Sequence, residues 1–238
     1  MREKKVANHS SNQKDVNCYD ELRKFNNNIK KESDQNKIEY CLELMVFKNF
    51  PTRWDGLIGE DITNNALTIK ALPIKIDYEK PIEIRGEIFL TKQNFEKINV
   101  QILDDDKKCS NCRNTASGSL RQLDPKITAK CNLSLVVYQI INKNEEVRIG
   151  QQSKIIEFLR FLKFNVAKEI KVCLGIKEMI NQIEKFNSIR NNLAYPIDVV
   201  VINVNQLSLY KTLGEISKFP KMAIGYKFAL TILVTKIK

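Results

Sequence analysis

The stretch that decides the fold runs from Asn111 to Lys130 and has the sequence NCRNTASGSLRQLDPKITAK. The small residues TASGS in its middle leave little side-chain bulk, so another backbone or a phosphate chain can come close to it. Leu120 and Leu123 follow at a spacing that puts them on one face of a helix. We expect the helix to break at Asp124-Pro125, because a residue before proline is disfavoured in the helical conformation. By physical chemistry alone, the stretch is a tightly packed helix with solvated basic ends.

The order of the residues in this stretch is more informative than their types. Arg113-Asn114, the run from Gly118 to Pro125 and the run from Ile127 to Lys130 resemble a signature of the NAD-dependent DNA ligases, inside their adenylation domain. An ordered match of this length is far more specific than a short glycine motif. The resemblance implies the ligase nucleotidyltransferase fold, an α+β arrangement of antiparallel sheets with flanking helices around an AMP pocket. It also implies that DNA is bound by basic residues of this stretch, namely Arg113, Arg121 and Lys126.

Length and composition are those of a globular protein with a basic charge balance. The chain has 238 residues, of which 43% are hydrophobic and 28% charged, and this is enough for one good-sized core. A net charge of +11 predicts attraction to a polyanion such as nucleic acid. Lysine, asparagine and isoleucine are abundant throughout, however, and such a bias raises the pI without any partner. No apolar run is long enough to span a membrane and the N-terminus has no apolar signal stretch, so we expect a cytoplasmic protein.

The six cysteines are expected to be free thiols in a chain without a secretory signal. Cys109 and Cys112 have the spacing of a zinc-ligand pair, and Cys131 is a candidate third ligand. A fourth ligand is harder to supply, because His9 is the only histidine and is remote in the sequence. We therefore interpret the pair as structural or incidental and expect no metal site.

The N-terminal region supports two interpretations. Residues 1–14 are polar, and we expect them to be disordered. Residues 18–31 have the periodicity of a short amphipathic helix, with an apolar stripe made of Tyr19, Leu22, Phe25 and Ile29. The resemblance implies instead that residues 15–36 are a remnant of the N-terminal module that recognises the nicotinamide half of NAD. Tyr19 and Asp20 would then contact NAD.

The nucleophile motif of the family, Lys-x-Asp-Gly after a Glu-Leu pair, is not intact in this chain. In the family, the lysine amine attacks the α-phosphorus of NAD and expels nicotinamide mononucleotide. One alignment makes Glu43 the nucleotide-binding glutamate and puts Met45 at the lysine position, where a thioether cannot form the phosphoramidate. A second alignment keeps the lysine as Lys37 but loses the Asp and the Gly. Lys48 is a third candidate amine.

Resemblance to the family returns at residues 52–56, whose sequence is Thr-Arg-Trp-Asp-Gly. Trp54 replaces a glycine of the family, and this is costly if the position needs a positive φ or a close backbone approach. The resemblance implies that Arg53 lies beside the AMP. Residues 59–65, GEDITNN, then follow the family pattern closely.

A strand and a helix are predicted in the next segment. Residues 82–90 have the pattern of a strand, and Arg85-Gly86-Glu87 within it resembles the third motif of the family. The resemblance implies that Glu87 hydrogen-bonds the nucleotide, although an isolated Arg-Gly-Glu is more often a solvated strand edge. Thr91 is a candidate N-cap for a helix over 92–103, with a buried face made of Phe95, Ile98 and Ile102. The three aspartates at 104–106 are adjacent and do not converge on a metal, so we expect a solvated loop.

The second half of the chain continues the α+β pattern. Alternation predicts a strand over 133–141, and helical periodicity predicts helices over 151–163 and 176–190. Their apolar stripes are typical of a core rather than of a cofactor site; they are Ile155, Ile156, Leu159 and Leu162, then Ile176, Met179, Ile180 and Ile183.

Two further family motifs lie near the C-terminal end. Residues 195–205 predict a strand at the position of the fourth motif, where Val199 replaces a glycine and Asn203 replaces a lysine. An amide can hydrogen-bond a phosphate but cannot neutralise it. Residues 220–228 match the fifth motif, and the resemblance implies that Lys227 reaches the α-phosphate of the nucleotide.

The resemblance covers nearly the whole chain and assigns residues 37–238 to a nucleotidyltransferase domain. No oligonucleotide-binding fold, zinc module, helix-hairpin-helix array or BRCT module is expected. The implied function is that of an NAD-dependent DNA ligase, which seals nicks in duplex DNA through an enzyme-AMP intermediate and uses NAD and Mg²⁺. Loss of the nucleophile and of the cation at Asn203 predicts impaired activity. The alternative is a catalytically inactive relative that binds DNA or nucleotide. Nicked double-stranded DNA is the expected partner, and another ligase fragment is a second candidate.

Overall fold

The computed structural model describes residues 10–33, 38–45, 60–104, 108–142, 149–216 and 219–228. The first half holds α1 (Ser10–Ser33), β1 (Glu39–Met45), α2 (Thr63–Ala66), β2 (Glu83–Phe89), α3 (Lys92–Gln101), α4 (Cys112–Leu120) and α5 (Pro125–Cys131). The second half holds β3 (Ser134–Asn142), α6 (Gln152–Phe161), β4 (Ile170–Leu174), α7 (Gly175–Ile189), η2 (Arg190–Asn192), β5 (Val199–Val204), α8 (Ser208–Leu213), β6 (Glu215–Ile216), β7 (Phe219–Pro220) and β8 (Ala223–Lys227). Helices and antiparallel sheets are therefore mixed along the chain, as expected for an α+β protein.

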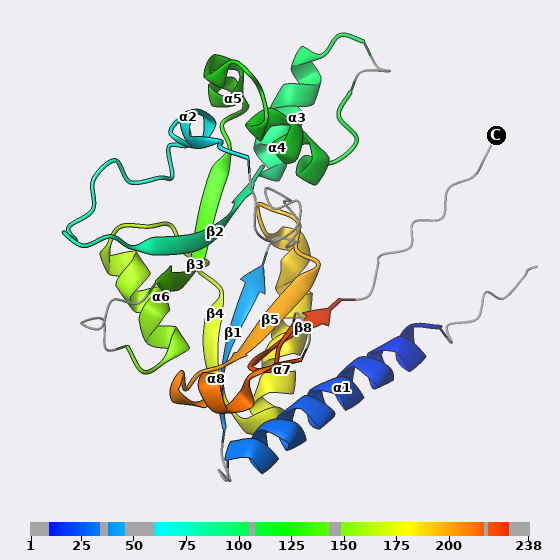
Figure 1. Ribbon diagram of the computed structural model, residues 1–238. Coiled ribbons are helices and arrows are strands. Elements are labelled where there is room, and N and C mark those ends of the chain that lie inside the picture. The colour runs from blue at the N-terminus through cyan, green and yellow to red at the C-terminus, as the bar shows by residue number, and fades with distance from the viewer. Residues whose placement is uncertain are drawn as a thin grey trace, which may run out of the picture.

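A four-stranded antiparallel sheet forms one part of the molecule, with strand order β4-β1-β5-β8. Helices α1 and α7 cover one of its faces (Figure 1). Alternate strand residues point to that face and join a core with the helices; they include Tyr40, Leu42, Val200, Ile202, Val204 and Tyr226. Because side chains alternate along a strand, the other half of the residues points to the opposite face of the sheet.

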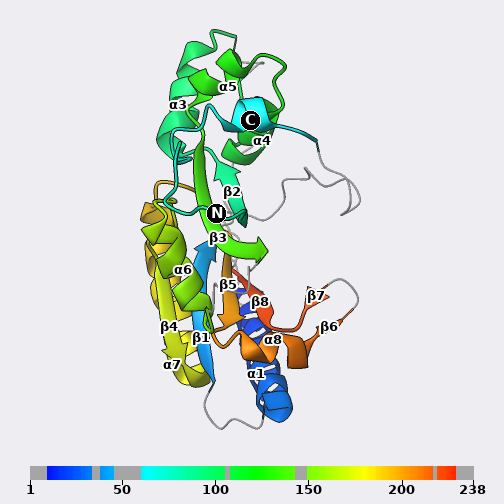
Figure 2. The same cartoon turned by 60° about the vertical axis from the view of Figure 1, so that its left-hand side comes forward.

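A second, two-stranded sheet pairs β2 with β3 and forms the other part, together with helices α2 to α6 (Figure 2). Its core contains Leu135 and Val137 from β3, Leu120 from α4 and Leu159 from α6. Gly86 is required by this packing, because a Cβ there would lie 2.7 Å from the carbonyl oxygen of Val136. The glycine in Arg85-Gly86-Glu87 therefore has a steric explanation in the fold.

Hydrogen bonds join the two parts at both ends of β5. Beyond its C-terminal end, the carbonyl of Asn205 accepts from the Gln152 amide at 2.7 Å, and the Asn205 side chain accepts from the Ser153 amide at 2.9 Å. Before its N-terminal end, the carbonyl of Ala194 accepts from the amide of Lys92 at 2.8 Å. These bonds hold the β2–β3 part against the ends of β5, and the β2–β3 sheet lies above the four-stranded sheet in the view of Figure 2.

Helix α1 is part of the core of the four-stranded sheet. Its residues Leu22 and Ile29 are each only 1% exposed, which confirms the predicted apolar stripe. The helix begins at Ser10, so residues 10–14 are helical and not disordered as predicted. The rest of the predicted tail, residues 1–9, lies outside the described residues.

The signature stretch forms two capped helices, whereas the sequence predicted one helix that breaks at Asp124-Pro125. Asn111 caps α4 by accepting from the Asn114 amide at 2.8 Å, and Asp124 caps α5 by accepting from the Lys126 amide at 2.9 Å. Proline then occupies the first turn of α5, where its missing N–H costs nothing. The expected helical face shared by Leu120 and Leu123 is wrong, because α4 ends at Leu120. Leu123 lies in the following turn and is fully exposed.

Most of the other predicted elements are confirmed with small shifts. Thr91 caps α3 through the amide of Asn94 at 3.2 Å, but the predicted buried face of this helix is only half-buried. The core stripe of α6 is confirmed, with all four predicted residues at most 2% exposed. The strand predicted over 195–205 is shorter and spans Val199 to Val204.

Candidate nucleotide site

Two residues from the family motifs lie on the face of the four-stranded sheet away from α1 and α7. They are Asn203 of β5, which replaces a lysine, and Lys227 of β8. Residues paired across antiparallel strands point to the same face of the sheet. Val199 pairs with Lys227 of β8 and with Met45 of β1, while Asn203 pairs with Ala223 and with Cys41. The neighbours of these residues along β5 and β8 point into the helix-covered core. Asn203 and Lys227 therefore share the face away from α1 and α7, four residues apart along the sheet; Cys41 and Val201 on the same face are buried, so this face is not covered by those helices but is not open throughout.

Glu87 lies on β2, in the other part of the molecule. Glu87 and Phe89 are two residues apart in a regular part of the strand, so they point to one face of β2. The ring of Phe89 lies 5.0 Å from the ring of Tyr195, which precedes β5. The neighbour Ile88 packs instead into the core of the β2–β3 part. Glu87 is thus a buried carboxylate, 8% exposed, on the side of β2 that faces the chain leading into β5.

Tyr195 adds a neutral phenol at this junction. Burial is the main cause that raises its pKa to about 12, and the carboxylate of Glu169, which accepts from the phenol at 3.4 Å, adds to the shift. The phenol therefore stays protonated at neutral pH. No sequence pattern indicates a function for Tyr195, because aromatic residues before a buried strand are ordinary core residues.

Of the segment aligned with the nucleophile motif, the structure describes residues 38–45. Glu43 pairs with Val201 and Met45 with Val199, so the backbone of Met45 lies in one row with that of Lys227. Lys37, Lys48, Arg53 and Trp54 lie outside the described residues.

Tyr19 and Asp20, the two residues expected to contact the nicotinamide half of NAD, lie on the helix-covered side of the sheet. The ring of Tyr19 stacks on that of Tyr226 at 5.8 Å, and Tyr226 points away from the face that carries Lys227. Asp20 accepts a hydrogen bond from Arg23 at 2.8 Å on the same helix. The structure therefore does not bring Tyr19 and Asp20 together with Asn203, Lys227 and Glu87.

A family model described as NAD-dependent DNA ligase adenylation domain matches residues 12–231 of the chain. The chain belongs to this family. The match begins inside α1 and ends after β8, so it includes the four-stranded sheet and the β2–β3 sheet.

Curated DNA ligases are similar to this adenylation domain over nearly its whole length. The DNA ligase of Malacoplasma penetrans is 42% identical over 236 residues, which are 93% of this chain and 33% of the relative. The DNA ligase of Bacillus subtilis is 39% identical over 92% of this chain and 34% of its own length, and that of Clostridioides difficile is 38% identical over 91% and 34%. The chain thus spans about a third of the length of the curated relatives it matches.

The three basic residues expected to bind DNA lie at the end of the adenylation domain formed by α2, α4 and α5 (Figure 1). Arg113 is half-buried in the first turn of α4, and Lys126 is exposed at the start of α5. Arg121, just after α4, forms an ion pair with Glu60 at 3.0 Å. Arg121 and Glu60 line a polar hollow of about 410 Å³, together with Asp61, Ile62, Thr63, Asn64, Asn65, Gln122, Leu123 and Pro125.

Asn65 holds this end together, and sequence reasoning did not single it out. Its side-chain amide is buried and donates to the carbonyls of Leu120 at 2.7 Å and Gln122 at 2.8 Å. These are carbonyls at the C-terminal end of α4, which have no partner within the helix. The sequence signal that could have identified Asn65 is its place in the motif 59–65. Through Asn65, this motif contacts the signature stretch.

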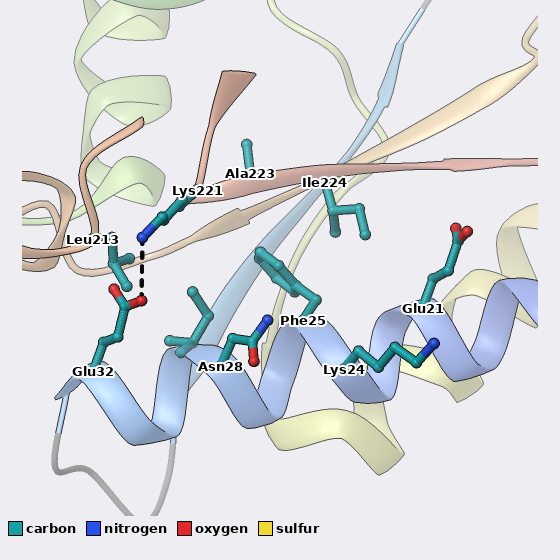
Figure 3. A pocket seen from close by; sticks show the side chains of 10 residues that line it. Glu21, Lys24, Phe25, Asn28, Glu32, Leu213, Lys221, Ala223 and Ile224 are labelled. Carbon is teal, nitrogen blue, oxygen red and sulfur yellow. Dashed lines mark hydrogen bonds and ion pairs between the residues drawn. The ribbon is translucent and has the colours of Figure 1, made fainter. Parts of the chain in front are cut away.

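A second hollow, of about 530 Å³, lies between α1 and β8 on the helix-covered side (Figure 3). Phe25 and Ile224 point into it, and an ion pair of 3.3 Å between Glu32 and Lys221 closes one end. Its other lining residues are Glu21, Lys24, Asn28, Ile29, Leu213 and Ala223. None of the nucleotide-binding residues expected on β2 or β5 lines this hollow.

The cysteines are free thiols where the structure describes them. Cys109 is held by Asn99, whose side chain accepts from the Cys109 amide at 2.8 Å and donates to its carbonyl at 3.1 Å. Within the described ranges, no group of three or more histidine, cysteine or acidic side chains is placed to hold a metal ion. Across the same ranges, no helix is long and apolar enough to cross a membrane. Asp105 and Asp106 lie outside them.

Proposed function

We propose that this chain is the adenylation domain of an NAD-dependent DNA ligase and that it binds the adenylate group of NAD between its two sheets. The observation that carries the proposal is the strand register, which puts Asn203 and Lys227 on one uncovered sheet face. We propose that Glu87, a buried residue of β2, completes the site from the neighbouring sheet. The AMP pocket of the family would be the space between these walls.

The three side chains suit an adenine nucleotide. The buried carboxylate of Glu87 accepts hydrogen bonds and fits the amino or hydroxyl donors of an adenosine. Asn203 is half-buried and both donates and accepts, while the ammonium of Lys227 neutralises a phosphate. NAD supplies the adenylate group that the family transfers. Described residues offer no set of carboxylates for Mg²⁺, so we propose no metal held by the protein alone, although the family implies this ion.

The register supports the alignment that puts Met45 at the position of the nucleophile. A family lysine there would lie in one row with Lys227, where both could reach the same phosphorus. Lys37 precedes the start of β1, and at about 3.3 Å per residue the first residue of this strand, Glu39, is about 20 Å from Met45. Lys48 follows Met45 by three residues and is the better placed of the two amines in the sequence. We propose that self-adenylation is impaired because a thioether occupies the attacking position.

The family reaction gives the chain its expected partner. Nick sealing requires nicked duplex DNA, and we propose that Arg113, Arg121 and Lys126 contact its phosphates. Polar and basic groups at the α2-α4-α5 end are compatible with this role. A second ligase fragment could supply the parts of the longer relatives that this chain does not span. With DNA as its substrate, we expect the protein in the cytoplasm.

The alternative function is that of a catalytically inactive relative which retains nucleotide or DNA binding. Met45 in the row of Lys227 and Asn203 in place of a lysine both favour it, because each removes an amine from the site while leaving its walls intact. Both functions share nucleotide binding and differ in whether AMP is transferred to the protein.

Intact mass after incubation with NAD and Mg²⁺ tests the proposal. Impaired self-adenylation predicts an adduct on a small fraction of the wild-type chain, whereas the inactive relative predicts AMP binding without an adduct. With either function, we expect Met45→Lys to gain the mass of one AMP in most molecules. An adduct on the wild-type chain that Lys37→Ala or Lys48→Ala abolishes would contradict the Met45 alignment and establish a relocated nucleophile. Absence of AMP binding by the folded protein would contradict the nucleotide site itself.

A further inference from the structure

Val199 occupies the centre of the row in which a phosphate would lie. The row consists of Met45, Val199 and Lys227 on three neighbouring strands. Neighbouring strands are about 4.8 Å apart, so the backbones of Met45 and Lys227 are separated by about 10 Å, with Val199 between them. A phosphorus midway between the two outer positions lies over Val199.

The side chain of Val199 leans toward β8 and covers backbone there. Its Cγ1 lies 3.3 Å from the point where a Cβ on Gly225 would stand. Gly225 itself has no side chain and is exposed, and Val199 is only half-buried. A branched apolar group therefore covers the floor of the site at the place where a phosphate needs polar or charged neighbours.

The part of this sheet face formed by β5 and β8 also carries few charged residues. The residues of β5 and β8 that share the uncovered face are Val199, Val201, Asn203, Ala223, Gly225 and Lys227. Lys227 is the charged residue of this set, and one ammonium neutralises one phosphate. A second phosphate held over the methyl groups of Val199 would lose water without gaining a partner, and this is unfavourable.

We infer that Val199 makes this site selective for adenosine mononucleotides over NAD. The terminal phosphate of AMP is attached on one side only, so it can shift from the methyl groups toward Lys227. The first phosphate of NAD is tethered on both sides, and among the described residues of β5 and β8 on this face its second phosphate has no cation besides Lys227. This inference rests on the proposed nucleotide site and names the ligand class that the site accepts.

Calorimetric titration of the full chain with AMP and with NAD tests the inference. We expect the wild-type protein to bind AMP at least about tenfold more tightly than NAD, since a few methyl groups change binding by about 10-fold or more. Val199→Gly is expected to remove most of this difference by tightening NAD, and Val199→Ala to remove part of it. Val100→Ala is the control, because Val100 is a valine 80% exposed on α3, in the other part of the molecule. It should keep the wild-type preference.

The outcomes separate this inference from the proposed function. Equal affinity of the wild-type chain for AMP and NAD, or an unchanged preference in Val199→Ala and Val199→Gly, would overturn the role of Val199 and leave the nucleotide site standing. Failure of every folded variant to bind either nucleotide would overturn the site and the inference together. Circular dichroism on each variant shows which of them are folded, and Val199→Ala keeps a Cβ in the strand if the glycine variant unfolds.

Discussion

Replacing Asn65 with alanine should loosen the end of the molecule that carries the signature stretch. The Asn65 amide makes two hydrogen bonds of 2.7 and 2.8 Å to carbonyls at the end of α4, and its side chain is buried. Each such bond contributes about 1 kcal/mol net, and an acceptor left buried without a partner adds a further penalty. We therefore expect Asn65→Ala to lower the free energy of unfolding by about 2–3 kcal/mol.

Urea unfolding followed by circular dichroism measures this change, and Asn64→Ala is the matched control. Asn64 precedes Asn65 in the same short helix and is exposed, so its replacement should change the free energy of unfolding by less than about 0.5 kcal/mol. Hydrogen exchange should show faster exchange in α4 and α5 for Asn65→Ala. Equal stability of the two variants would refute the reasoning that Asn65 clamps the motif 59–65 onto the signature stretch.

Three further results are expected. Gly86→Ala should lower the free energy of unfolding by about 1–3 kcal/mol in urea titrations, because the added methyl meets the β3 backbone at 2.7 Å. Lys221→Ala should cost less than about 1 kcal/mol in the same assay, since its ion pair with Glu32 is about one-third exposed; a larger loss would mean that the pair supports the hollow beside α1. Burial, with the carboxylate of Glu178 adding to it, raises the pKa of Cys173 to about 11, so native alkylation by iodoacetamide should be slow at pH 8 and rise only as the pH nears 11. Fast labelling of Cys173 in the folded protein at pH 8 would contradict its burial.

Local features of the fold were accessible from the sequence because they depend on neighbours along the chain. The cap at Thr91 and the core stripe of α6 follow from side-chain chemistry and helical periodicity. The face expected for Leu120 and Leu123 failed because α4 ends one turn early, and periodicity alone does not mark where a helix ends. Residues 10–14 are helical although polar, since packing of the rest of α1 on the sheet extends the helix.

The candidate site could be predicted only in part. Family resemblance singled out Glu87, Asn203 and Lys227, and the register accounts for why they belong together: β5 pairs with β1 and β8, which are remote in the sequence. No local pattern predicts such pairings. The same resemblance suggested a nucleotide role for Tyr19, yet its stripe on α1 is the one that packs on the sheet core. An apolar stripe on a helix is thus better explained by packing than by ligand binding.

Mapping the site of photolabelling by 8-azido-AMP tests the central claim most directly. The folded chain would be irradiated with the label, digested, and analysed by mass spectrometry, with excess AMP as the competitor. We predict that AMP-protected label is found on peptides containing β2, β5 or β8, from the uncovered sheet face. Protected label confined to α1, beside the hollow lined by Phe25 and Ile29, would contradict the claim that the nucleotide binds between the two sheets.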